Sequence, residues 1–214
     1  MVEPMDIALP DAKLHLAELA SPLANSQIKV HFEIRALKFI SKQTQSASFR
    51  FDPLSKLSVE QALKFSAQHN ATGWNIYVTP NPLVRSRLIS TPAKDTDVLF
   101  ASHIFLDADE KNTAQELLQS IRVDYDFIVV TGTKPHLRLH MYIQLQEPME
   151  DLRMWKYLLK RMIAIHDCDP AASNAARIMR LAGFINYPPD HKCLKGYTTE
   201  LVKFYAKDEY HDFL

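Results

Sequence analysis

The clearest pattern of the chain lies near its middle, where apolar and polar residues alternate strictly from His136 to Leu145. Successive side chains of a strand point to opposite faces, so one set faces a core and the other set shares the opposite face. The apolar set is Leu137, Leu139, Met141, Ile143 and Leu145, and the polar set is His136, Arg138, His140, Tyr142 and Gln144. Packing explains poorly a strand face with two histidines, an arginine and a tyrosine. We therefore predict that this face belongs to a functional site.

Other short apolar or alternating segments predict further strands, at 30–36, 49–51, 74–79, 98–109, 127–131 and 197–204. Apolar residues at helical spacing, with capping-box patterns at Ser58 and Thr113, predict helices at about 58–69, 113–121, 151–165 and 173–181. Residues 1–27 read as an N-terminal extension with one short helix, ahead of a domain at 28–214. Strands joined by hairpins or crossed by single helices indicate an α+β fold.

Two carboxylates stand at the end of the most apolar of these strands, in Phe105-Leu106-Asp107-Ala108-Asp109-Glu110. If the strand stays regular, Asp107 and Asp109 lie on one face and repel each other unless a cation separates them. Oxygen ligands of this kind suit Mg²⁺ or Mn²⁺. Asp169 offers a third carboxylate, although Asp167 competes with it for that role.

Two arginines follow these acids along the chain. Arg177 and Arg180 are three residues apart on the predicted helix, and so they share one of its faces. Arginine is always charged and offers a planar fork of donors to phosphate oxygens. The sequence thus places candidate phosphate ligands shortly after the candidate metal ligands.

Composition narrows the possible functions. A hydrophobic content of 47% argues against disorder, and a formal net charge of zero excludes a generally cationic nucleic-acid coat protein. No apolar run approaches the ~18 residues of a membrane span, and the acidic start lacks the basic region of a signal peptide. The two cysteines have no CxxC spacing, so we expect a reducing compartment and a cytoplasmic location.

Taken together, the motifs resemble the archaeo-eukaryotic primase (AEP) superfamily, in particular plasmid RepB-type primases and phage primase-polymerases. The Asp107-x-Asp109 strand is similar to the first family motif. Thr131-Gly132 with His140-Met141-Tyr142 resembles the second. Asp169, Arg180-Leu181-Ala182-Gly183 and Asn186 resemble the third, with Ala182 in place of the common proline. The segment from Trp74 to Pro80 is similar to the strand that precedes the first motif, so the resemblance spans roughly residues 28–204.

The resemblance implies an α+β AEP fold with two mixed-sheet lobes, one of them RRM-like, and flanking helices. It also implies DNA-template-directed nucleotidyl transfer, by a primase or primase-polymerase of plasmid or phage-type replication, with two divalent ions (Mg²⁺ or Mn²⁺). Asp107, Asp109 and Asp169 are then the catalytic, metal-binding carboxylates. The implied nucleotide-binding residues are His140, Arg180, His136, Arg138, Lys134 and Asn186. The implied nucleic-acid-binding residues are Arg177, Lys156 and Lys160.

The implied partners are a single-stranded DNA template, an NTP or dNTP, and a helicase or helical accessory domain supplied in trans. No membrane partner is expected. Trp74 or Tyr77 could stack on a base. One motif is ambiguous, because His136 fits the spacing after Gly132 better, whereas His140 fits the residues that follow. We favour His140.

Three other functions stay open at this point. A metal-dependent nicking or relaxase enzyme would need a helical tyrosine such as Tyr157, but His136-x-x-x-His140 lacks that class's usual histidine spacing. A non-catalytic single-stranded nucleic-acid-binding module would have no need of Asp107 and Asp109. A nucleotide-sugar glycosyltransferase also uses Asp-x-Asp, but it gives no account of Arg180 and Asn186.

Overall fold

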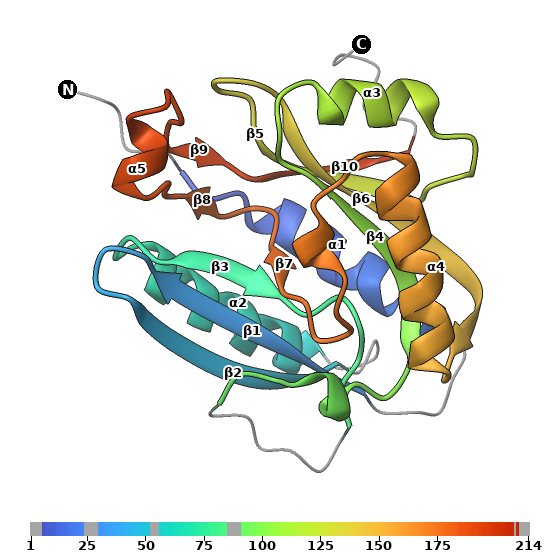
Figure 1. The fold of residues 1–214 in the computed structure, drawn as a ribbon. Helices are drawn as coiled ribbons and strands as arrows, with labels where there is room; N and C mark the ends of the chain where they lie inside the picture. Colours follow the sequence, from blue (N-terminus) through green and yellow to red (C-terminus); the bar gives the residue numbers. More distant parts are fainter. Residues whose placement is uncertain (1–5, 24–29, 52–55, 85–90, 208, 210–214) are drawn as a thin grey trace.

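The computed structural model describes residues 6–23, 30–51, 56–84, 91–207 and 209, and their strands form two four-stranded sheets and one two-stranded sheet. Figure 1 shows the two larger sheets in separate parts of the molecule, so we call each sheet with its helices a lobe. The α+β class predicted from the sequence is confirmed. Every strand pairing among the described residues is antiparallel, whereas the resemblance implied mixed sheets.

The first lobe has the strand order β2-β1-β3-β7. Its strands are β1 (Val30–Lys38), β2 (Gln43–Phe51), β3 (Asn75–Val78) and β7 (Met179–Arg180), and helix α2 (Lys56–Asn70) packs across β1, β2 and β3. The short strand β7 comes from a distant part of the chain and pairs with β3. The last third of the chain is thereby joined to the first lobe.

The second lobe has the strand order β10-β5-β6-β4. Its strands are β4 (Ala101–Ala108), β5 (Phe127–Gly132), β6 (Arg138–Met149) and β10 (Lys203–Ala206). Helix α3 (Thr113–Ser120) contacts β4 and β6, and α4 (Leu152–Ile165) packs on the edge strand β4. The Asp151 side chain accepts hydrogen bonds from the first free N–H groups of α4, as an N-cap residue should.

Smaller elements connect the lobes. They are the 3₁₀ turns η1 (Ser21–Leu23), η2 (Asp95–Asp97) and η3 (Pro170–Ala172), the strand pair β8 (Ile185–Asn186) and β9 (Glu200–Leu201), and the four-residue helix α5 (Asp190–Cys193). The predicted helix at 173–181 is wrong. Asp95 binds the Ala176 N–H and the Asn174 side chain, and Met179 and Arg180 pair with β3, so tertiary contacts override the helical propensity of this segment.

The N-terminal helix α1 (Leu9–Ala20) is packed into the core and contacts both β10 of the second lobe and α2 of the first. Leu16 and Leu19 are buried in it, and the His15 ring meets Tyr142 and Phe127 edge-on. The helix begins against Gly183, because Ala8, the residue just before the helix, donates its N–H to the Gly183 carbonyl at 2.8 Å. Gly183 has a φ of +84°, and a Cβ there would lie 2.3 Å from the Ala8 oxygen, so only glycine allows this approach.

Helix α1 also helps to bury the polar face of β6, which the alternation had marked as the face opposite the core. The polar face of this strand is buried, because Tyr142 packs under α1 and Arg138 and His140 lie inside the molecule. Both faces of β6 are therefore buried from Arg138 to Tyr142, and within this stretch His140 lines a cavity.

Candidate active site

A pocket of about 620 Å³ lies between the lobes and gathers side chains from both. From the first lobe come β3, β7 and the turn that joins β1 to β2. From the second lobe come the ends of β4, β5 and β6. The remaining lining residues lie in the segment that follows α4. The lining residues are Phe39, Lys42, Tyr77, Asp107, Asp109, Thr131, His140, Asp169, Arg177, Ile178, Arg180, Pro189, His191 and Lys192.

Strand pairing places Asp107 beside His140. The two residues are direct partners of β4 and β6, and His140 Nε2 lies 3.6 Å from Asp107 Oδ1. Burial, and then the carboxylates of Asp109 and Asp169, raise the pKa of Asp107 to about 7. Burial and then the charge of Arg180 lower the pKa of His140 well below its ordinary value. His140 is therefore neutral at pH 7, and its contact with Asp107 is no salt bridge.

Asp169 joins the site through the backbone. Its N–H donates to the Asp107 carbonyl at 2.8 Å, and its side chain caps η3 by accepting from the Ala171 N–H. Arg177 Nη2 lies 3.6 Å from Asp169 Oδ2. Asp167 is exposed, with a φ of +51°, and does not line the pocket. The structure thus places Asp169, and not its competitor, next to Asp107.

Arg180 reaches the pocket from β7. Its guanidinium donates to Asn75 Oδ1 at 2.8 Å and lies 5.0 Å from the ring centre of Tyr77, its partner on β3. Arg177 and Arg180 both line the pocket, although they belong to a turn and a strand and not to the predicted helix.

Asp109 meets two cations of the protein itself. Lys192 Nζ donates to Asp109 Oδ2 at 2.7 Å, and Arg138 Nε lies 3.7 Å from Asp109 Oδ1. His136 Nε2 lies 2.9 Å from the Asp109 carbonyl oxygen, to which it can donate. Of the two candidate histidines, His140 lines the pocket and His136 contacts the backbone behind it.

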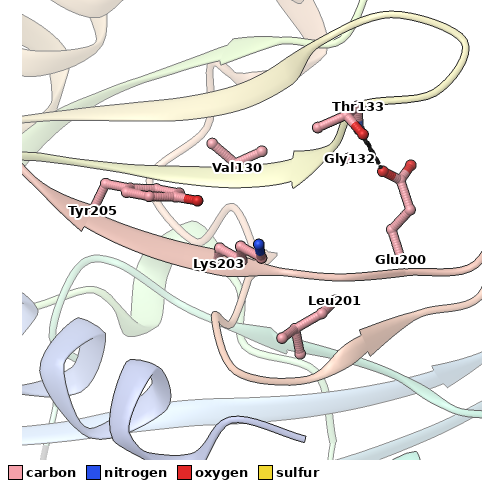
Figure 2. A pocket seen from close by; sticks show the side chains of 7 residues that line it. All are labelled: Val130, Gly132, Thr133, Glu200, Leu201, Lys203 and Tyr205. Atoms are coloured by element: carbon pink, nitrogen blue, oxygen red, sulfur yellow. Dashed lines mark hydrogen bonds between the residues drawn. The ribbon is translucent and has the colours of Figure 1, made fainter. Parts of the chain in front are cut away.

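Arg138 forms an ion pair with Glu200. Arg138 Nη2 donates to Glu200 Oε1 at 3.1 Å, and its other terminal nitrogen donates to the Lys134 carbonyl. Glu200 also accepts from the N–H and the hydroxyl of Thr133, and Figure 2 shows its carboxylate pointing to that residue. Gly132 must lack a side chain, because a Cβ there would lie 1.8 Å from the Arg138 guanidinium.

A second, smaller pocket, shown in Figure 2, lies next to Glu200 and Thr133. It measures about 260 Å³ and is lined by Val130, Gly132, Thr133, Glu200, Leu201, Lys203 and Tyr205. None of these residues lines the larger pocket. Glu200 is therefore connected to the larger pocket through Arg138, which lies 3.7 Å from Asp109.

Several predicted site residues lie away from the larger pocket. Arg138 is only 2% exposed and does not line it. The Lys134 side chain is exposed elsewhere, and Asn186 is buried and donates to the Thr131 carbonyl. Lys156 and Lys160 lie on α4, outside the pocket. Trp74 packs against His69, whereas Tyr77 is in the pocket.

Sequence reasoning missed Lys192, Phe39, Lys42 and Glu200. Lys192 lies in an aperiodic segment after Pro188-Pro189, and Phe39 and Lys42 belong to a hairpin turn of the other lobe. The only available signal was the basic pair His191-Lys192. These residues come together through the packing of the two lobes, which no local pattern encodes.

The donor set suits a hard divalent cation, since three carboxylates from two segments lie close enough to raise the pKa of one of them. As they stand, no three His, Cys, Asp or Glu side chains of the described residues are near enough to hold one ion. Asp107 instead contacts the neutral His140, whereas Asp109 and Asp169 contact the cations Lys192 and Arg177.

No family model and no curated protein matches this sequence. Solved structures do match. The AEP domain of the cyanophage S-2L primase-polymerase superposes with a TM-score of 0.59 at 20% identity, over 94% of this chain and 91% of that one. The chain has the fold of an AEP primase domain.

Two structures of primase RepB′ also share this fold. One has a TM-score of 0.59 at 14% identity, over 91% of this chain and 56% of that one. The other, the catalytic domain in complex with initiator DNA, has a TM-score of 0.56 at 13% identity, over 93% of this chain and 85% of that one. Separately, no helix in the described part of this AEP-like chain is long and apolar enough to cross a membrane.

Proposed function

We propose that this chain is a DNA-template-directed nucleotidyltransferase of the primase or primase-polymerase type. One observation carries the proposal. Three carboxylates, a neutral histidine and two arginines from separate segments line one pocket, in a fold shared with primase domains. The order of the motifs along the chain supports the same function.

In this proposal Asp107, Asp109 and Asp169 hold two divalent cations, Mg²⁺ or Mn²⁺, which supply Lewis-acid activation of a 3′-hydroxyl and charge neutralisation of the triphosphate. Arg180, oriented by Asn75, and Arg177 bind phosphate oxygens. His140, neutral and beside Asp107, donates one hydrogen bond to the incoming nucleotide. Tyr77 forms an aromatic wall for that nucleotide.

The template and the replication context belong to the proposal as well. One structural neighbour is a primase bound to initiator DNA, which supports single-stranded DNA as the template partner here. Lys42 and Phe39, which line the pocket from the turn between β1 and β2, offer a cation and a ring to that strand. We place the activity in plasmid or phage-type replication, in the cytoplasm, alongside a helicase or helical domain supplied in trans.

The nicking alternative has less support. Tyr157 is 56% exposed on α4, and it lies under Arg161 rather than in the pocket with Asp107. A tyrosine nucleophile must reach the metal site, and this tyrosine lines no part of it. The proposed enzyme therefore accounts better for the pocket residues.

The test is incorporation of labelled NTPs and dNTPs on single-stranded DNA with Mg²⁺ or Mn²⁺. We expect the Asp169→Asn variant to lose at least about a hundredfold in activity, because a ligand of the reacting centre is removed. Asp167→Asn, two residues away and outside the pocket, is the matched control and should keep wild-type activity. Asp107→Ala/Asp109→Ala should be inactive.

Equal loss in both asparagine variants would show that folding, not chemistry, is affected. Synthesis that survives Asp107→Ala/Asp109→Ala would refute the carboxylate site. A covalent DNA–protein product would favour the nicking enzyme instead.

A further inference from the structure

Lys192 places its own positive charge directly on Asp109, one of the proposed metal ligands. Its ammonium nitrogen lies 2.7 Å from Asp109 Oδ2, which is a short charge-assisted hydrogen bond. An ammonium group at this distance and a divalent ion on the same carboxylate would repel each other strongly. A divalent ion bound to Asp109 therefore favours departure of the ammonium group.

Of the two protein cations on Asp109, only Lys192 can leave. Arg138 is buried, bound to Glu200 and to the Lys134 carbonyl, and seated over Gly132. Lys192 is 36% exposed and extends from the one-turn helix α5, next to Leu194, which is 90% exposed. Its flexible stem can carry the ammonium group away from Asp109 while the backbone stays in place.

A released Lys192 remains among the phosphate-binding cations. Its ammonium lies 4.9 Å from the Tyr197 ring centre, and Arg138 lies 4.4 Å from the same ring, so Tyr197 keeps both cations near Asp109. Arg177, Arg180 and Lys192 all line the larger pocket, so the three cations face one volume.

We propose that Lys192 is a displaceable counter-ion, which neutralises Asp109 in the metal-free protein and moves to the phosphates of the nucleotide when a divalent cation takes its place. This inference rests on the proposed function of Asp109 as a metal ligand. It couples the two ligands, because metal binding frees a phosphate-binding group, and by linkage nucleotide binding favours the metal.

The test is titration with Mn²⁺ alone, following the free-ion signal by electron paramagnetic resonance, on the full chain and three variants. We expect Lys192→Met to bind Mn²⁺ about two- to fivefold more tightly than wild type, the range that loss of a partly exposed ion pair allows. Lys195→Met removes an exposed lysine of the same segment and should bind as wild type does. Asp109→Asn should lose the ion.

A second titration uses a fluorescent analogue of ATP in the presence of saturating Mn²⁺. Lys192→Met should weaken its binding about fivefold or more, so that the variant gains metal affinity and loses nucleotide affinity together. Asp109-dependent Mn²⁺ binding that Lys192→Met leaves unchanged or weakens would overturn the counter-ion proposal alone. Mn²⁺ binding that does not depend on Asp109 would overturn the metal site as well.

Discussion

Two single residues show how strongly burial shifts the pKa of a side chain in this protein. His15 and His103 lie inside the molecule, and burial lowers the pKa of each to about 3, with His103 adding to the effect on His15. Each ring uses Nδ1 for one hydrogen bond, His15 from the Ala182 N–H and His103 with the Ser102 hydroxyl. Both histidines are therefore neutral members of the core, and the proposed chemistry involves neither.

These two histidines make the folded state sensitive to acid. In the unfolded chain they take up protons below about pH 6.5, whereas the folded protein does so only near pH 3. Stability is thus fully present above pH 6.5 and falls with decreasing pH, by about 1.4 kcal/mol per pH unit for each histidine. We expect the free energy of unfolding, measured with urea at pH 4.5, 5.5 and 6.5, to fall less steeply with decreasing pH in His15→Gln or His103→Gln than in wild type.

Asp107 contributes with the opposite sign. Because its folded pKa is raised to about 7 from 3.8, the folded state binds its proton first, and this group stabilises the protein as the pH falls from 7 to 3.8. Comparing each histidine variant with wild type at the same pH cancels this contribution. Identical slopes in all proteins would show that the two rings take up protons without unfolding.

At the scale of elements, the turn between β5 and β6 is held by a residue from β9. Glu200 accepts from Thr133 and Lys134 and binds Arg138, which in turn faces Asp109. Burial alone would raise the pKa of Glu200, but the Thr133 and Lys134 hydrogen bonds and the Arg138 charge lower it. The two-residue strand β9 thereby positions Arg138, which lies next to Asp109.

We expect Glu200→Gln to lower the free energy of unfolding by about 2 kcal/mol, because it leaves the buried Arg138 charge with one carboxylate fewer. Glu147→Gln, an exposed glutamate on β6, is the matched control and should change stability by less than about 0.5 kcal/mol. Urea unfolding measures both. A control that loses as much as Glu200→Gln would remove the reason to assign the anchor to this carboxylate.

At the scale of the whole molecule, α1 is part of the core and not an appendage. Its side chains are buried in the core, and the helix contacts β10 of the second lobe and α2 of the first. The helix thus contributes to the packing of both lobes between which the pocket lies.

Leu19→Ala should therefore destabilise the protein by about 2–5 kcal/mol, the usual cost of a cavity at a fully buried leucine. Leu14→Ala, on the same helix but 50% exposed, should cost less than about 0.5 kcal/mol. Thermal or urea unfolding distinguishes them. If Leu19→Ala unfolds as wild type does, α1 contributes nothing to the global fold.

The sequence by itself determined the local elements and the chemistry that they carry. Alternation predicted β6, and an apolar run ending in two acids predicted β4 with Asp107 and Asp109, because these patterns depend only on the period of a strand. The motifs also identified Asp169, His140 and Arg180, and all of them line the pocket.

The tertiary structure alone decided which polar groups meet. It placed His140 and not His136 in the pocket, and it buried Arg138 against Glu200. In the sequence, all three residues belong to the same polar face of the alternating segment. It also turned the predicted helix at 173–181 into a turn and a strand, and it brought Lys192 to Asp109 from a segment with no pattern. Local periodicity reports the face on which a side chain lies, whereas its partner depends on contacts between segments far apart in the chain.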